Sequence, residues 1–525
     1  MNQQTYESLL ENHFGYSTFR EGQKEIIVDV LNGKDVLGIL PTGTGKSLCY
    51  QFPAVMMEGT VLIISPLISL MIDQVKQLKQ QGFKKVTAIN SFLNGEQKRE
   101  IYKSLDSYKL IYCSPEMLQT EQFIRELSNR VNISLFVVDE AHCISQWGHE
   151  FRPDYLKLDD TLQQLGNPTL LALSATAPKN VQDDIIEQLG REKMNKHIYP
   201  MDRDNIAFSV EHVSHMNEKI NRMKEILTSH PVPTMIYFSS RQWTEKVAYE
   251  LSQSLQHLRI AFYHGGMEQV DRLLIQQQFM NDQLDVICCT SAFGMGVNKS
   301  NIRLVIHAHL PSQLESFIQE VGRAGRDGKQ SVSLMFYSPG DSEIPKGFIE
   351  GELPGQETLQ KTFTFLYKWG YLQGNHVKSN EEMESLLDIG EIQWRFLRYQ
   401  FEKHDMIEQT YIKYDEKKWR RAFEQIQLFI QERTNIKHRK LEELINWIHQ
   451  ENCLRESLYK PFQHSLKSPQ GYCCDRCDFL FSHWKVDDKK QTKQVLGWME
   501  ELKQICLQGE TYEMDKSSRA NQTTN

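Results

Sequence analysis

A glycine-rich turn between two apolar runs carries the strongest chemical signal in the sequence. Leu40-Pro41-Thr42-Gly43-Thr44-Gly45-Lys46-Ser47 follows the run Val36–Ile39. Such a turn between a strand and a helix presents backbone N–H groups to a phosphate chain. Lys46 would reach the β- and γ-phosphates and the Ser47 hydroxyl would hold Mg²⁺. Because Leu40 stands where the strict pattern has glycine, a plain turn is the alternative. The predicted nucleotide-binding residues here are Thr42, Gly43, Thr44, Gly45, Lys46 and Ser47.

An acidic pair follows a second apolar run. Asp139 and Glu140 come directly after Leu135–Val138, which is typical of a strand buried on both faces of a parallel sheet. In such sheets ligands bind at the carboxyl ends of the strands. Asp139 is therefore predicted to hold the metal ion through water, and Glu140 to orient or deprotonate the attacking water. An acidic surface turn is the alternative.

The loop before the phosphate-binding turn offers groups that suit a nucleobase. The Gln23 amide can both donate and accept, as adenine recognition requires. Tyr16 or Arg20 would stack on the ring. A solvated loop preceding a helix over Gln23–Leu31 is the competing interpretation.

Two arginines lie three residues apart much later in the chain. Arg323 and Arg326 follow Gln319 in Gln319-Glu320-Val321-Gly322-Arg323-Ala324-Gly325-Arg326. Their spacing predicts one helical face, and the planar guanidinium matches phosphate oxygens in a bidentate way. An arginine supplied from a facing domain is worth roughly 10³–10⁵ in rate. Hydrolysis would then depend on closure of the cleft.

Alternating strand-like and helical segments must position these groups. Runs over 60–64 and 171–176 and a helical pattern over 70–81 continue the first domain, and strands over 234–238, 285–289 and 304–306 start a second. This alternation predicts an α/β fold with two tandem parallel-sheet domains. The predicted divisions are 1–204 and 205–340 for the sheet domains, 341–435 for a helical, winged-helix or bundle region, 436–485 for a zinc-binding module, and 486–525 for a C-terminal helix and disordered tail.

Four cysteines near the end of the chain form the inventory of a zinc site. Cys453 is followed by Cys473, Cys474 and Cys477, which suits a tetrahedral Cys₄ centre. His464 or His483 would each be able to replace one thiol, and disulfides are the alternative. Structural zinc contributes about 10–16 kcal/mol of apparent binding free energy in small modules, so this segment is expected to need the metal to fold.

Composition limits the remaining possibilities. The 525 residues are 40% hydrophobic and 24% charged with a net charge of −8, as in an ordinary globular protein. No secretory signal and no membrane-length apolar run is found, so a cytoplasmic location without membrane contact is expected, with nucleoid association in a bacterium. Nucleic-acid binding would need local basic grooves. Tyr411–Lys440 holds nine Lys/Arg against four Asp/Glu, which suits duplex DNA or a solvated helix face.

The motifs in this order resemble a superfamily 2 helicase core, and narrower features resemble the RecQ family of DNA helicases. The resemblance covers about residues 10–340 and includes Asp139-Glu140-Ala141-His142, Ser174-Ala175-Thr176, Ala292–Asn298 and His142–Tyr155. It implies two RecA-like domains, with ATP, Mg²⁺ and Zn²⁺ as cofactors. It also implies adenine recognition by Gln23 and Arg20, hydrolysis by Asp139 and Glu140, and an arginine finger from Arg326 with Arg323, in the segment that Gln319 begins.

The resemblance further implies 3′→5′ translocation on single-stranded DNA and unwinding of duplex DNA, with a single-strand-binding protein or repair factors as candidate partners. Trp147, Phe151 and Arg152 resemble the family's aromatic-rich loop, and stacking there would tolerate any base; interdomain packing is the alternative. Loops at the sheet ends are predicted to bind phosphodiesters through Ser65, Ser114, Ser239, His264 and Thr290. An RNA helicase and a nucleotide-gated DNA-binding or annealing protein remain open.

The chain departs from the family after the zinc module. Members commonly carry a winged-helix domain there, whereas only the 48 residues 478–525 follow Cys477. The strand-separating hairpin is therefore not carried over. Either the segment 356–412 replaces it, with a capping box at Ser379, a helix over Glu391–Lys403 and a hairpin over 406–412, or unwinding is weak and depends on the motor.

Overall fold

The computed structural model describes residues 3–90, 93–145, 152–294, 299–372, 376–463 and 465–485. Residues from Phe481 onward form a separate unit, of which a 3₁₀ turn over Phe481–His483 is described.

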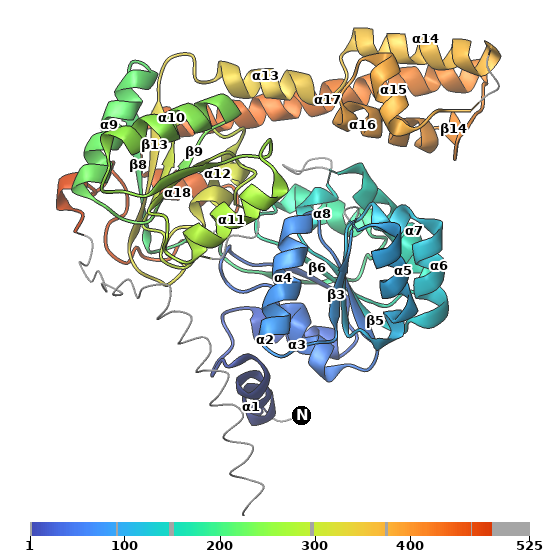
Figure 1. Ribbon diagram of the computed structural model, residues 1–525, viewed down its shortest axis with the longest axis horizontal. Coiled ribbons are helices and arrows are strands. Elements are labelled where there is room, and N and C mark those ends of the chain that lie inside the picture. Colours follow the sequence, from blue (N-terminus) through green and yellow to red (C-terminus); the bar gives the residue numbers. More distant parts are fainter. Residues whose placement is uncertain are drawn as a thin grey trace, which may run out of the picture. The chain divides into compact units, whose positions relative to one another are not determined.

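The first sheet is parallel throughout and has the strand order β3-β4-β2-β5-β6-β1-β7. Alternate residues of its strands enter two separate cores. Leu37 and Ile39 belong to one core, and Val36 and Leu40 to the other. Helices therefore cover both faces (Figure 1), as the continuous apolar runs predict. The strands are β1 (Val36–Ile39), β2 (Thr60–Ile64), β3 (Val86–Ile89), β4 (Leu110–Cys113), β5 (Ile133–Val138), β6 (Thr169–Ser174) and β7 (Asn195–Ile198).

The helices of this lobe connect the strands in turn. The helix α2 begins at Gln23, as predicted, and α3 begins at Leu48, directly after the glycine-rich turn, while α4 begins two residues before its predicted start. The helices are α1 (Gln3–Phe14), α2 (Gln23–Leu31), α3 (Leu48–Met56), α4 (Ile68–Gln80), α5 (Gly95–Lys103), α6 (Glu121–Arg130), α7 (Leu158–Gln164) and α8 (Lys179–Gln188).

The second sheet is also parallel, with the order β10-β11-β9-β12-β13-β8. The fold class is therefore the predicted one, two parallel-sheet lobes followed by a mainly helical region. Its strands are β8 (Ile206–His212), β9 (Thr234–Tyr237), β10 (Ile260–Tyr263), β11 (Val286–Cys289), β12 (Leu304–His307) and β13 (Ser331–Tyr337), and its helices are α9 (Met216–Ser229), α10 (Arg241–Ser254), α11 (Gln269–Met280) and α12 (Leu314–Val321).

The region after the second sheet contains a winged-helix-like unit, residues 353–426, with its own apolar core around Trp394, Phe401 and Trp419. Its helices are followed by an antiparallel hairpin, and His376 adds a bridge to Tyr411. A plain helical bundle lacks these strands, so the structure favours the winged-helix alternative. The elements are α13 (Glu343–Glu352), α14 (Gln356–Leu372), α15 (Asn380–Leu387), α16 (Glu391–Lys403), β14 (Ile407–Glu408), β15 (Tyr411–Ile412), α17 (Glu416–His449) and α18 (Leu454–Tyr459).

The helix α17 is 34 residues long and runs from the winged-helix-like unit to the second lobe (Figure 1), where it contacts α12 and α18. Its second half is not the basic surface that the charge count suggests. Arg433 and Lys437 pair with Glu352 of α13, and Lys440 lies 2.7 Å from Glu315 of α12. The exposed basic residues are concentrated in its first two turns, at Lys417, Lys418, Arg420 and Arg421. Among the described residues, no helix is both long and apolar enough to span a bilayer.

Candidate functional site

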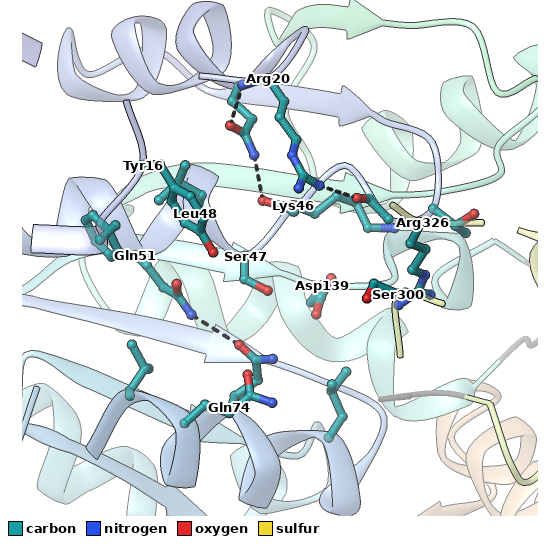
Figure 2. A pocket seen from close by; sticks show the side chains of 18 of the residues that line it. Tyr16, Arg20, Lys46, Ser47, Leu48, Gln51, Gln74, Asp139, Ser300 and Arg326 are labelled. Atoms are coloured by element: carbon teal, nitrogen blue, oxygen red, sulfur yellow. Dashed lines mark hydrogen bonds between the residues drawn. The ribbon is translucent and has the colours of Figure 1, made fainter. Parts of the chain in front are cut away.

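A cleft of about 530 Å³ brings together residues from both lobes. It lies beyond the carboxyl ends of β1 and β5, where an α/β sheet binds its ligands. Figure 2 shows Lys46, Ser47 and Asp139 facing the same space, with Arg326 beside them. Of the predicted nucleotide and catalytic residues, Thr44 alone is not among its lining. Those that line it are Tyr16, Arg20, Gln23, Thr42, Gly43, Gly45, Lys46, Ser47, Asp139, Glu140, Gln319, Arg323 and Arg326.

The phosphate-binding turn is built as its sequence predicts. Strand β1 ends at Ile39, and α3 begins at Leu48 directly after Ser47. Gly43 and Gly45 have φ values of +83° and +77°, a conformation that favours glycine because it has no Cβ. Leu40, in the position of the missing glycine, is fully buried against the sheet core. An apolar residue there is therefore a packing contact and leaves the turn intact.

Gln23 braces this turn. Its Nε2 donates to the carbonyl oxygens of Thr44 and Gly45 at 2.7 and 3.0 Å, and its Oε1 accepts from the Arg20 N–H at 2.9 Å. The Arg20 Nη1 donates to Gly43 O at 2.5 Å (Figure 2). Both ends of the Gln23 amide are thus engaged within the protein, so these bonds must exchange before the amide can recognise adenine. Adenine recognition stays a prediction.

The acidic pair sits at the end of β5 with unusual backbone and electrostatics. Glu140 has a φ of +49°, a strained conformation for a non-glycine residue that concentrates at functional sites. Its N–H donates to Asp139 Oδ1 at 3.0 Å. Burial, followed by the charge of Glu140, raises the pKa of Asp139 to about 7, while Lys46 acts in the opposite direction. A bound cation would oppose this penalty and favour the ionised form.

A polar chain leads away from Glu140. The Nδ1 of His142 lies 3.5 Å from Glu140 Oε2 and 3.0 Å from Ser174 Oγ. The Ser174 hydroxyl donates its own proton to the carbonyl of Thr176 at 3.3 Å. Burial, with smaller contributions from Lys46 and other cations, lowers the pKa of His142 to about 3. The imidazole is therefore neutral near pH 7, and it joins β5 to β6 by hydrogen bonding.

The arginine pair approaches the phosphate-binding turn, although the predicted shared helical face is wrong. Helix α12 ends at Val321, and both arginines lie in the turn that follows, in which Gly325 has a φ of +54°. Arg323 donates to Gly294 O. A Cβ added to Gly43 would lie 3.0 Å from Arg326 Cγ, so this side chain packs against the turn.

Three arginines, Arg203, Arg323 and Arg326, lie close together beside the phosphate-binding turn, and this affects the pKa of Arg326. Burial, and then the neighbouring guanidinium groups of Arg323 and Arg203, lowers the pKa of Arg326 to about 9. Close like charges and burial disfavour the charged form of a base, and an anion relieves both effects. The arrangement therefore suits a polyanionic ligand such as a triphosphate.

Several lining residues were missed by the sequence analysis. Gln51 donates to Gln74 of α4 at 3.1 Å, and Ser300 also lines the cleft (Figure 2). Thr18 is a further lining residue. Gln51 lies one helical turn after Ser47, and this spacing was the available signal. Arg203, which contacts Thr42 O without being one of the lining residues, was missed as well, because it lies in the connection between the lobes, outside every motif.

The predicted nucleic-acid contacts are in mixed surroundings. Trp147 and Phe151 lie outside the described residues, whereas Arg152 donates to Pro66 O at 2.9 Å. Ser65, Ser114 and His264 are buried, and His264 lies 2.7 Å from Glu245. Contact with a strand through these three side chains would require local movement. Ser239 and Thr290 are half-buried, and all eight assignments stay predictions.

The four predicted cysteines converge. Their Sγ atoms all lie within 4.8 Å of one another, and three pairs are 3.5, 3.6 and 3.9 Å apart. A disulfide requires about 2.05 Å, whereas Zn–S bonds of about 2.3 Å in a tetrahedron place sulfurs about 3.8 Å apart. The thiols therefore fit a zinc ion and do not fit disulfides. His464 lies outside the described residues, and His483 belongs to the separate unit.

The fold and this cleft define a two-lobed helicase-type nucleotide hydrolase. The sequence matches the DEAD/DEAH box helicase family over residues 20–184 and the helicase conserved C-terminal domain over 218–328. It resembles in fold the DEAD-box helicase Mss116 bound to single-stranded RNA and UDP-BeF (TM-score 0.56, 16% identity, 87% of this chain and 94% of that one) and Mycobacterium smegmatis helicase Lhr bound to single-stranded DNA and AMP-PNP (0.53, 19%, 75% and 56%).

Closer relatives narrow the class. The chain is 40% identical over 502 residues to the probable ATP-dependent DNA helicase RecS of Bacillus subtilis, covering 94% of this chain and 97% of that protein. It is 42% identical over 336 residues to the ATP-dependent DNA helicase RecQ of Haemophilus influenzae, covering 64% and 53%. It therefore spans about half the length of that RecQ. The chain belongs to the RecQ family of ATP-dependent DNA helicases.

Proposed function

We propose that the protein is an ATP- and Mg²⁺-dependent DNA helicase that translocates 3′→5′ on single-stranded DNA and unwinds duplex DNA in recombination, repair or replication. The observation that carries this proposal is the meeting of Lys46, Asp139 and Arg326, from two lobes, in one cleft. Membership of a family whose relatives are named DNA helicases favours DNA over RNA as the nucleic acid.

Each group in the cleft has a distinct task in ATP hydrolysis. The N–H groups of the turn and Lys46 would bind the phosphate chain. Ser47 and Asp139 offer the oxygen ligands that Mg²⁺ prefers, and this ion neutralises charge on the phosphates when bound. Glu140 would orient the attacking water and accept its proton. Arg326 would stabilise the charge that develops on the γ-phosphate.

Contact between the lobes is the proposed link from hydrolysis to movement. Thr42 Oγ1, in the phosphate-binding turn, donates at 3.2 Å to Gly322 O. Gly322 begins the turn over residues 322–326 that carries Arg323 and Arg326, called the arginine turn. Gln276 of α11 donates to Asp73 of α4 at 2.5 Å. These contacts span the cleft, so a change in its contents alters both lobes. Closing and opening in turn would advance a strand that both lobes bind.

We propose a structural zinc ion for the cysteine cluster. Cys474 pairs with Phe208 of β8, and the Asp475 carboxylate accepts from the backbone N–H of Val210 at 2.7 Å. Fixing the four thiols would therefore hold the segment around Cys474 against the edge of the second sheet. Zinc supplies folding free energy at such a site and takes no part in the hydrolysis.

A strand-displacement assay with and without ATP tests the proposal. The wild-type protein should release a labelled strand from a duplex with a 3′ single-stranded tail, in an ATP-dependent manner, and release less from one with a 5′ tail. Lys46→Ala should lose ATPase and displacement, while Lys103→Ala, an exposed lysine at the end of α5, which contributes no residue to the lining of the cleft, should keep both. Equal activity without ATP, or normal turnover by Lys46→Ala, would contradict the proposal. Stronger ATPase stimulation by RNA than by matched DNA would redirect it to an RNA helicase.

A further inference from the structure

Arg203 lies in the connection between the last strand of the first sheet and the first strand of the second, three residues before β8. Its guanidinium reaches both sides of the cleft. Nη1 donates to Thr42 O at 3.2 Å and to Gly322 O at 3.3 Å, and Nη2 donates to Gly325 O at 2.6 Å. One side chain thus joins the phosphate-binding turn to the arginine turn.

These contacts hold backbone segments in place and leave Arg203 no direct part in the chemistry. The acceptors are backbone carbonyls, to which weaker contacts at 3.4 Å add Ala324 O and the side-chain oxygen of Asn205. A planar fork with donors on both Nη atoms can hold two backbone segments at a fixed spacing, which a single ammonium group cannot do. The Arg203 guanidinium also packs closely against Gly43 of the phosphate-binding turn, since a Cβ added to Gly43 would lie 3.4 Å from Arg203 Nη1.

The backbone of Arg203 is itself held by the segment that carries the cysteine cluster. Arg455 of α18 donates to Arg203 O at 2.8 Å and also to Ile206 O, and it is only 2% exposed. Gln463 accepts from the N–H of Met201 at 2.6 Å. The connection between the lobes is therefore held by Arg455 and Gln463, while the Arg203 side chain contacts the phosphate-binding turn and the arginine turn.

We infer that Arg203 is a positioning residue that sets the spacing between the phosphate-binding turn and the arginine turn, and that Arg455 holds it in place. It acts through Thr42 and Gly322 and delivers Arg326 to the phosphate chain. This inference rests on the proposed function, because it assigns Arg203 to the same hydrolysis.

The inference predicts a specific kinetic signature. Without the fork, the phosphate-binding turn keeps its own N–H groups and Lys46, so binding of ATP changes little. The position of Arg326 relative to the γ-phosphate is no longer fixed, and misplacement by about 1 Å can cost about 10²-fold in rate. Arg203→Met, which keeps the apolar stem, and Arg203→Lys should both lower kcat by roughly 10- to 100-fold with KM for ATP within about threefold.

The experiment measures kcat and KM for ATP hydrolysis at saturating single-stranded DNA, with thermal unfolding measured in parallel. Arg259→Ala, an exposed arginine of the second lobe, is the control and should match wild type. A double-mutant cycle adds the sharper readout: Arg203→Met together with Arg326→Ala should be no slower than Arg326→Ala alone, because the first acts through the second.

Unchanged kcat in Arg203→Met, a loss confined to KM, or multiplicative losses in the double variant would each overturn the inference. If Arg203→Met unfolds at a lower temperature than wild type, kcat and KM for ATP are measured below its unfolding transition. The variant Arg455→Met is then measured as well. Arg455→Met should then reproduce the kcat loss, and a normal kcat would overturn the role of Arg455. Failure of the proposed function is distinguishable, because wild type itself would then show no DNA-stimulated ATPase.

Discussion

Substitution of Gly322 by alanine tests whether contact between the two lobes is needed for hydrolysis. Gly322 has a φ of −60°, which alanine adopts freely, so the backbone itself opposes nothing. An added Cβ, however, would lie 1.9 Å from Thr42 Oγ1, 3.0 Å from Thr42 Cβ and 3.1 Å from Ile318 O. The change therefore pushes the arginine turn away from the phosphate-binding turn.

The size of the effect follows from the overlap. Overpacking typically costs about 1–3 kcal/mol, and the lobes avoid the clash by separating. The closed arrangement would then become about 5- to 150-fold less populated. We expect DNA-stimulated kcat for ATP hydrolysis to fall by a factor in this range, with the unfolding temperature unchanged or slightly raised, because Gly→Ala also reduces the entropy of the unfolded chain.

Two further variants make the test specific. Gly347→Ala, in α13 with nothing within 4 Å of the added atom, should keep full activity. Thr42→Ala removes the 1.9 Å overlap, so Gly322→Ala with Thr42→Ala should recover part of the lost kcat, although the 3.0 Å contact remains. If Gly322→Ala hydrolyses ATP within twofold of wild type, or if the second substitution gives no recovery, the reasoning about this contact is wrong.

Three other predictions follow from features outside this contact. Cys474→Ser should lower the zinc content measured by mass spectrometry and the unfolding temperature, whereas Cys288→Ser, a buried thiol in β11, should retain the metal; equal zinc in both would contradict a Cys₄ site. Arg395 of α16, in the winged-helix-like unit, lies 3.0 Å from Glu116 and 2.6 Å from Asp154 of the first lobe, and each partly exposed pair contributes about 1 kcal/mol. Arg395→Ala should loosen this contact and make the chain between α13 and α14 more susceptible to proteases, and unchanged cleavage would contradict a role of Arg395 in holding the unit against the first lobe. Burial alone would raise the pKa of Asp29, but hydrogen bonds from Lys34, Asn195 and His197 lower it to about 2. This carboxylate therefore stabilises the fold above about pH 4, and its contribution disappears as the pH falls toward 2. In urea unfolding, the free energy of unfolding should fall less between pH 7 and pH 3 for Asp29→Asn than for wild type.

Strand positions and the catalytic layout of the first lobe were predictable from sequence for a physical reason. Strands buried on both faces must be apolar throughout, so Thr60–Ile64 and Val36–Ile39 stand out and were located to the residue. Polar groups directly after such strands meet at one edge of the sheet. The cleft position of Asp139 follows from this rule, and that of Lys46 follows from the phosphate-binding turn that begins where β1 ends.

Other features depend on contacts that local patterns do not contain. The helical face expected for Arg323 and Arg326 fails because the chain leaves α12 at Gly322, and spacing alone did not reveal that exit. Arg433 and Lys437 count as basic residues in a sequence window, yet each is paired with Glu352, some 80 residues earlier. Arg203 contacts groups more than 100 residues away on both sides, and no local signal marks it.

The continuity of α17 has a consequence for how the protein tolerates length changes. Its 34 residues rise about 1.5 Å each, about 50 Å in total, and Trp419, Arg433 and Lys440 contact different partners along it. Each residue inserted into a helix turns everything beyond it by about 100°. A single insertion near the middle would therefore put the two ends out of phase, whereas seven residues, close to two full turns, would restore the facing and shift one end by about 10 Å. Natural variation in this helix should accordingly come in multiples close to whole turns.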